Sequence, residues 1–324
     1  MRLPDSVAVA VALALFSGHA ASAQTDAYPA KVITMIVPAA PGGTTDLSAR
    51  ILSEPLTRAL GKQVVVDNRP GGNGTIATSA VARAKPDGYT LLMQYSGYHV
   101  ITPLLTPQPW DPVKSFAPVA NVISAPQVIV VRSGLPVKSL KELVAHAQAN
   151  PGKLTYASSG NGSLQHVTGA LLEQSAGIKL LHVPYKGTGP ALVDLVGGSV
   201  DMTFTTAPPL VGHISAGKLR PLAITGKTRL SSLRDVPTAA EAGYPQLDVT
   251  SWFALYAPAG TPKPVVDKLT GEIAAITKNA AFVQKAEEQG AQASYMNPEQ
   301  LAEYTRAELG RWQAVVKSAG IKAE

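Results

Sequence analysis

Cysteine is absent from the 324 residues of the chain. This absence excludes a disulfide scaffold, thiolate zinc sites, iron–sulfur clusters and cysteine nucleophiles. Charged residues are scarce at 15%, and the net charge of +6 is spread along the chain without a dense basic cluster. We therefore expect no nucleic-acid partner. The six histidines show no metal-ligand spacing, so we expect neither a metal nor a cofactor.

Long apolar runs are also missing, with one short exception at the start of the chain. Residues Val7 to Phe16 are wholly apolar, follow Arg2 and precede Ala21-Ser22-Ala23. This pattern predicts a cleaved secretory signal peptide over residues 1–23, since such a run is too short to span a bilayer. An uncleaved N-terminal anchor is the alternative. We expect a soluble mature protein in the periplasm.

The rest of the chain alternates between predicted strands and predicted helices. Lys31–Pro38 is rich in β-branched residues, and Asp46–Leu60 carries apolar residues at helical spacing up to Gly61. Leu164–Ala176 is a second amphipathic helix, and after Trp252–Ala257 we expect only helices. This alternation predicts an α/β fold with parallel sheets covered on both faces, and the length suggests two domains.

A strand, a glycine-rich polar turn and a helix follow one another twice, as AAPGGTTD and as SSGNGS with their flanks. Ligands of open α/β sheets bind beyond the carboxyl ends of the strands, and first-turn amides favour a carboxylate or phosphate. Either turn alone fits an ordinary N-capped turn, whereas the pair favours a shared anion site. The candidate ligand-binding residues of the two turns are Gly42, Gly43, Thr44, Thr45, Asp46, Ser158, Gly160, Asn161, Gly162, Ser163 and His166, and Ser159 offers the same chemistry.

Nucleotide and catalytic motifs are incomplete. Gly212–Lys218 matches G-x-x-x-x-G-K, but Leu219 stands where a magnesium-binding Ser or Thr belongs. Ser163 and His166 lie one helical turn apart, as a nucleophile and its base would, yet no third orienting group is identifiable. We expect no catalytic residues and no enzyme; an exported hydrolase using this pair is the alternative.

Longer segments of the chain resemble one known family. They include IVPAAPGGTTDLSARIL, VVVDNRPGGNGTIA, YASSGNGSLQHVTG, HVPYKGTGPALVDLVGGSVDMTF and SWFALYAPAGTPKPVVDKL. In order and over nearly the whole mature chain, these segments resemble the exported substrate-binding receptors of tripartite tricarboxylate transporters, often called Bug receptors. The resemblance implies a two-lobed, type II periplasmic-binding-protein fold with a ligand cleft between the lobes. It also implies that a small carboxylate is captured and delivered to a membrane permease. A sensor that serves a membrane kinase would share the same site.

The same resemblance guides our domain boundaries. We expect residues 28–124 plus 250–324 to form lobe 1 and residues 125–249 to form lobe 2. Two crossover strands, QVIVV and SWFALYA, would join them. Closure would bring the first glycine turn toward the second, and the two turns would grip one carboxylate. We expect the receptor to act as a monomer.

Three departures from the family pattern bear on the ligand. Ala39-Ala40 replaces the usual aromatic residue of the first turn, Tyr95-Ser96 with Tyr98 replaces small residues, and Thr205-Thr206 stands where Asp or Asn is common. Without that acid, a bound ammonium group would lack a partner. The tyrosines either offer ring faces to a ligand or pack against their lobe. We predict a carboxylate without an ammonium group, with aromatic acids slightly favoured over di- or tricarboxylates that could use Lys186.

Overall fold

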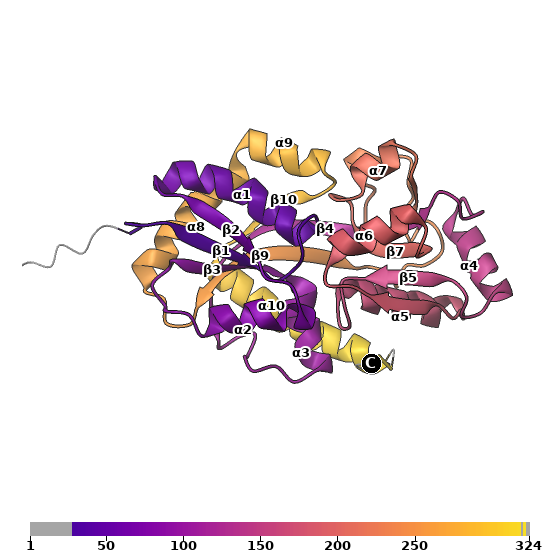
Figure 1. Cartoon of the computed structure of the whole chain (residues 1–324), viewed down its shortest axis with the longest axis horizontal. Helices are drawn as coiled ribbons and strands as arrows, with labels where there is room; N and C mark the ends of the chain where they lie inside the picture. Colours follow the sequence, from indigo (N-terminus) through magenta and orange to yellow (C-terminus); the bar gives the residue numbers. More distant parts are fainter. Residues whose placement is uncertain (1–27, 319, 322–324) are drawn as a thin grey trace, which may run out of the picture.

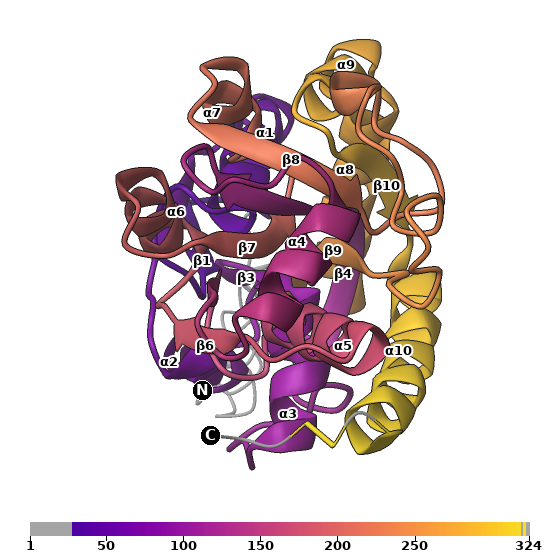
Figure 2. The same cartoon turned by 90° about the vertical axis from the view of Figure 1, so that its right-hand side faces the viewer.

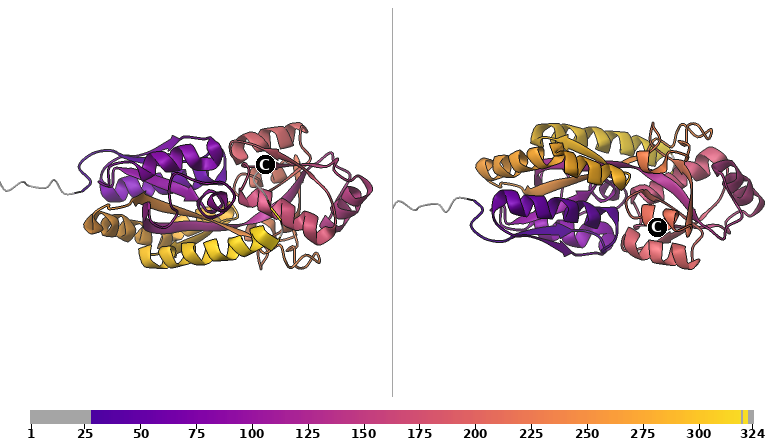
Figure 3. Two further views of the ribbon diagram at one scale, coloured as in Figure 1. Left: turned by 90° about the horizontal axis from the view of Figure 1, so that it is seen from below. Right: turned by 90° about the horizontal axis from the view of Figure 1, so that it is seen from above.

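The structure is a computed structural model that describes residues 28–318, 320 and 321. The predicted signal peptide lies outside these residues. The described chain forms two lobes side by side, and the strands β4 and β9 run along their common axis (Figures 1 and 3).

The first lobe is built on a half-sheet in the order β2-β1-β3-β9-β4, with β10 also paired to β4. Strands β1, β2 and β3 are parallel, whereas β9 runs antiparallel to β3 and β4. Its strands are β1 (Ile33–Val37), β2 (Val64–Asn68), β3 (Thr90–Tyr95), β9 (Thr250–Pro258), β10 (Gln292–Met296) and the first part of β4 (Phe116–Arg132). Its helices are α1 (Thr44–Leu60), α2 (Thr75–Ala82), α3 (Thr102–Leu105), α8 (Lys263–Lys278), α9 (Ala280–Glu288) and α10 (Pro298–Ser318).

The second lobe continues the sheet from the last part of β4 through β7, β5 and β6, with β8 also paired to β4. Alternate residues of β4 face opposite sides: Ile129 and Val131 pack with helices α4 and α5, and Val128 and Val130 with α6 and α7 (Figure 2). The elements are α4 (Leu140–Ala149), β5 (Thr155–Ser158), α5 (Leu164–Ala176), β6 (Leu181–Pro184), α6 (Thr188–Gly197), β7 (Met202–Thr206), α7 (Val211–Ser215) and β8 (Leu219–Ile224).

Strand β4 belongs to both lobes. Its 17 residues pair with β9 from Phe116 to Pro126, and from Gln127 onward they pair with β7 and β8. Strand β9 begins at Thr250, where this change of partner occurs. The two segments predicted to cross between lobes lie on these strands, while the boundaries after residues 124 and 249 stay a prediction.

The expectation of parallel sheets is wrong for the middle of the molecule. Strands β4, β8, β9 and β10 make only antiparallel pairs, so the sheet is mixed. Sequence reasoning also missed α9, β10 and the first part of β4. Pro118 and Pro126 interrupt the strand signal in β4, and the structure accommodates Pro118 at an irregular register next to β9.

The end of helix α1 and the start of helix α5 lie where the sequence predicts them. Helix α1 ends at Gly61, which adopts φ 65° in the left-handed region that favours glycine. Helix α5 spans the predicted residues, and the Ser163 side chain caps it by accepting from the amide of His166.

An aromatic cluster in the first lobe encloses His99. The ring stacks on Tyr256 at 4.5 Å and lies 6.0 Å from Trp110. Burial lowers the pKa of His99 from 6.5 to about 3, although the Pro112 carbonyl and the Asp111 carboxylate act in the opposite sense. The ring is therefore neutral in the folded protein.

This burial predicts a loss of stability in acid. Below pH 6.5 the unfolded chain protonates His99 and the folded chain does not, so the free energy of unfolding falls as the pH drops toward 3. At pH 4 the loss from this residue should reach about 3 kcal/mol. His99→Phe keeps a ring and removes the titration, so its urea-unfolding free energy should fall less between pH 7 and pH 4 than that of the wild type. An equal fall in both proteins would show that His99 contributes nothing.

Candidate functional site

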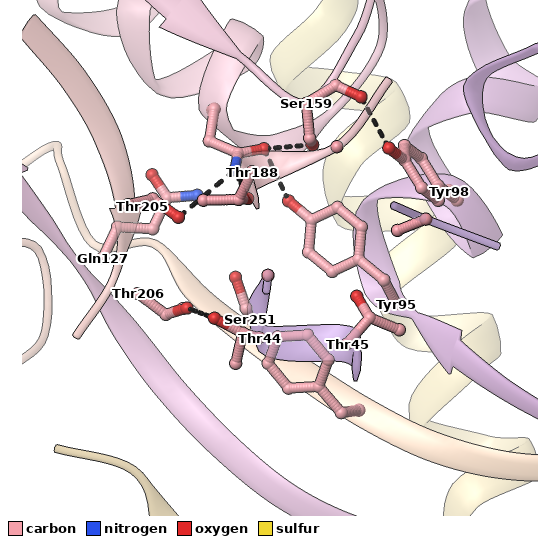
Figure 4. Close-up of a pocket in the computed structure, with 15 residues that line it drawn as sticks. Thr44, Thr45, Tyr95, Tyr98, Gln127, Ser159, Thr188, Thr205, Thr206 and Ser251 are labelled. Carbon is pink, nitrogen blue, oxygen red and sulfur yellow. Dashed lines mark hydrogen bonds between the residues drawn. The ribbon is translucent and has the colours of Figure 1, made fainter. Parts of the chain in front are cut away.

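A small cavity lies between the two lobes (Figure 4). Its volume is about 20 Å³, room for little more than a single water molecule. The loop after β1 with the start of α1, the end of β3 and the start of β9 supply one side, and β4, the start of α5, the start of α6 and the end of β7 with their loops supply the other. The lining residues are Ala39, Gly43, Thr44, Thr45, Tyr95, Tyr98, Gln127, Ser159, Gln165, Gly187, Thr188, Thr205, Thr206, Ser251 and Phe253.

The cavity wall is polar but uncharged. Hydroxyl groups dominate it, two glutamine amides join them, and no acidic or basic side chain occurs among the described residues that line it. The lobes already touch here, since Thr44 Oγ1 and Thr206 Oγ1 are 2.5 Å apart. An anion in this site would be held by neutral donors.

The first turns of helices α1 and α6 face one another across the lobes. A Cβ placed on Gly43 would lie 3.3 Å from the Cβ of Thr188, and the amide of Ala40 donates to the carbonyl of Lys186 at 3.2 Å. Each helix N-terminus carries unpaired amides and a partial positive charge, so two facing N-termini favour an anion between them.

Asp46 does not line the cavity. Its Oδ2 accepts from the amide of Gly42 at 3.0 Å, and its Oδ1 accepts from Arg50 Nε at 3.0 Å. The carboxylate thus fixes the shape of the first turn and is itself neutralised by Arg50.

One residue of the second glycine turn, Ser159, lines the cavity together with Gly43 and Thr44 of the first turn, and a carboxylate gripped by both turns stays a prediction. The first turn packs against Thr188 and Gly189 at the start of α6. In the second turn, Gly160 packs closely on Asn73, and a Cβ on Gly162 would lie 3.3 Å from the Cα of Thr102. Lys186-Gly187-Thr188-Gly189 connects strand β6 to helix α6, so a strand, a glycine-containing turn and a helix follow one another here for a third time. This pattern is visible in the sequence.

The structure divides the sequence candidates into two groups. The residues that line the cavity are Gly43, Thr44, Thr45, Tyr95, Ser159, Thr205 and Thr206. The other candidates are not among the lining residues. They are Gly42 and Asp46 in the first turn, Ser158, Gly160, Asn161, Gly162, Ser163 and His166 in the second, and Ser96. The Ser96 Oγ accepts from the amide of Trp252 at 3.2 Å. Sequence reasoning missed Gln127, Gln165 and Ser251, because no local motif marks a residue that only the lobe contact brings into a cavity.

Tyr95 and Tyr98 are packed and hydrogen-bonded. Tyr95 stacks on Phe253 at 5.6 Å and meets Tyr98 edge-on at 5.1 Å. The hydroxyl of Tyr98 donates to the Ser159 carbonyl at 2.5 Å. Burial raises the pKa of Tyr98 to about 12 and that of Tyr95 still further, so both remain neutral donors.

Ser163 and His166 do not form a nucleophile–base pair. The bond between them runs from the His166 backbone amide to Ser163 Oγ at 3.3 Å, which is a helix cap. The His166 ring uses Nδ1 to accept from the amide of Gly162 at 3.2 Å and stacks on His182 at 4.3 Å. This geometry does not support the hydrolase alternative.

Comparisons with known proteins identify the class of this fold and site. Residues 48–321 match the family described as "Tripartite tricarboxylate transporter family receptor". Protein BugT of Bordetella pertussis is 39% identical over 308 residues, which are 94% of each chain. The solved structure of R. palustris Rpa4515 with adipate is 36% identical at TM-score 0.89, over 91% of this chain and 99% of that one. MatC from Rhodopseudomonas palustris with bound malate is 33% identical at TM-score 0.84, over 89% and 100% of the two chains.

These matches define a solute-binding receptor with a two-lobed periplasmic-binding-protein fold. The chain belongs to the tripartite tricarboxylate transporter receptor family. The predicted family, fold class and receptor character, as opposed to an enzyme, are thereby confirmed. Over the residues described, no helix has the length and apolar character that crossing a membrane requires.

The contact between α1 and α6 predicts that Gly189 is needed for closure. A Cβ on Gly189 would clash with the Pro41 carbonyl of the other lobe, whereas one on Gly197 of the same helix would meet nothing within 4 Å. Gly189→Ala should therefore weaken ligand affinity at least about ten-fold, because it opposes the closed arrangement. Gly197→Ala should leave the affinity unchanged in calorimetric titration. Equal affinities for the two variants would contradict the role given to this contact.

Proposed function

We propose that this receptor captures a small aliphatic carboxylate between its lobes, outside the cytoplasmic membrane, and delivers it to the permease of a tripartite tricarboxylate transporter. The observation that carries the proposal is the pair of facing helix N-termini, α1 and α6, at an uncharged cavity lined with hydroxyl groups. Such a site offers an anion many neutral donors and leaves no acidic group to repel it.

The chemistry of the cavity also supports the class of ligand. An ammonium group would be desolvated here beside no acidic side chain among the described lining residues, which is costly. Tyr95 already stacks on Phe253 and meets Tyr98 edge-on, which weakens the reason to favour aromatic acids. Adipate and malate, found in the two similar structures, are aliphatic dicarboxylates. We therefore place aliphatic dicarboxylates ahead of aromatic acids.

Ligand entry requires the lobes to separate, because the cavity holds only about 20 Å³. Opening breaks the Thr44–Thr206 contact and the bonds of Tyr95 and Tyr98 to the second lobe. We propose that Gly43, Thr44 and Thr45 hold one carboxylate and that Thr188, Thr205 and Thr206 contact the ligand from the other lobe. The candidates that do not line the cavity position these groups.

Export and assembly complete the proposal. The apolar run over Val7 to Phe16 and the Ala21-Ser22-Ala23 site support a cleaved signal peptide over residues 1–23 and a periplasmic mature chain. We expect the receptor to act as a monomer toward its permease.

A thermal-shift panel tests the ligand class. Adipate, malate and citrate should raise the melting temperature with concentration, whereas glutamate and benzoate should raise it less, because a ligand that binds only the native state stabilises it. Each ligand should be recovered unchanged after incubation, as checked by NMR. A shift with glutamate alone, or conversion of a ligand, would rule out this function.

Thr44→Val tests the first turn. The variant keeps the β-branched shape and removes the hydroxyl that faces Thr206, so affinity for the best dicarboxylate should fall by about 1–3 kcal/mol. Ser53→Ala on the same helix is the control, because its hydroxyl is exposed and donates to the Arg50 carbonyl of the same helix at 3.2 Å. Normal titration behaviour of Thr44→Val would place the anion elsewhere.

A further inference from the structure

Gln165 is a lining side chain that is hydrogen-bonded to hydroxyls of both lobes. It follows the capped start of α5 and is 4% exposed. Its Oε1 accepts from Ser159 Oγ at 2.5 Å and from the Tyr95 hydroxyl at 3.3 Å. Its Nε2 donates to Thr188 Oγ1 at 3.0 Å and to Thr205 Oγ1 at 3.4 Å. A glutamine amide has two lone pairs and two protons, so these bonds use its full capacity.

The direction of these bonds follows from a backbone amide. The amide of Leu164 can only donate, and it donates to the Tyr95 hydroxyl oxygen at 3.1 Å. This bond occupies a lone pair of the Tyr95 oxygen and leaves its proton to be donated, and Gln165 Oε1 lies 3.3 Å away as an acceptor. Turning the amide over would place an N–H group against Tyr95 and leave a buried hydroxyl proton without this acceptor, which costs about 1–3 kcal/mol.

This orientation decides what the second lobe offers a ligand. Because Thr188 Oγ1 and Thr205 Oγ1 both accept from Gln165, each keeps its own proton for another partner. Both threonines line the cavity, so the wall opposite the first turn presents two hydroxyl donors. A group with only acceptor atoms, such as a carboxylate, satisfies both donors at once.

We propose that Gln165 makes the receptor selective for dicarboxylates, by orienting the hydroxyls of Thr188 and Thr205 as donors toward a second carboxylate of the ligand. This inference rests on the proposed function, in which the first turn holds the first carboxylate. Gln165 is a positioning residue in this scheme, because it acts through the two threonines. A matching monocarboxylate lacks the second acceptor group and leaves both donors buried without a partner.

The test compares adipate with hexanoate, which has the same chain length and one carboxylate. Wild-type protein should bind adipate about a hundred-fold more tightly than hexanoate in calorimetric titration. Gln165→Met keeps the length of the side chain and removes the oriented bonds, so the ratio should fall below about ten, mainly through weaker adipate binding. Gln174→Met on the exposed side of the same helix is the matched control and should keep the wild-type ratio.

A second variant keeps the test decisive if Gln165→Met unfolds, as checked by circular dichroism. Gln165→Glu has the same shape but, when ionised, only accepts, so Thr188 and Thr205 must turn their protons toward it. It should lose affinity for adipate more than for hexanoate. A purely structural role would weaken both ligands alike and leave the ratio unchanged.

The outcomes separate the two proposals. Wild-type protein that binds no carboxylate at all overturns the proposed function and this inference with it. Wild-type protein that binds adipate but prefers it no more than hexanoate overturns the inference alone. The inference alone is also overturned if Gln165→Met keeps the preference for adipate over hexanoate. If Gln165→Met does not fold, the same result with Gln165→Glu overturns it.

Discussion

Two helix N-termini face one another, and the protein itself does not compensate their partial positive charges. Helices α1 and α6 come from different lobes, and their first turns approach through Gly43 and Thr188. Their partial positive charges repel, and the nearby carboxylate of Asp46 is already taken up by Gly42 and Arg50. An anionic ligand relieves this repulsion only when the lobes are together, so binding and closure reinforce one another.

The uncharged wall follows from the same arrangement. A lysine or arginine would bind an anion even in the open protein, whereas hydroxyls and amides contributed by both lobes act together only on closure. Dipoles fixed by the fold also need no reorganisation when the ligand arrives. In our proposal, the hydrogen bonds of Gln165 and Tyr95 orient the hydroxyl groups of this wall, although neither residue carries a charge.

Sequence reasoning succeeded where structure depends on near neighbours in the chain. The glycine at residue 61, the cap at Ser163 and the apolar spacing of α5 are local signals, and the helices follow them. It failed where partners are distant. The antiparallel pairing of β4 with β9 depends on residues more than a hundred positions apart, and prolines in β4 hide the strand signal. In the site, Gly43 and Thr44 could be found from a motif, while Gln165 and Ser251 gain their place only through the contact between lobes.

The sheet of the first lobe also dictates the order in which the chain can fold. Strand β9 pairs with one edge of β3, and Leu92 lies opposite Tyr256 in this pair. Strands β5 to β8, in contrast, lie between residues 155 and 224 and assemble on the last part of β4. The first lobe thus depends on pairs between residues far apart in the sequence, and such pairs cost more loop-closure entropy than those within the second lobe. In a growing chain, the sheet of the first lobe stays incomplete until β9 has been made.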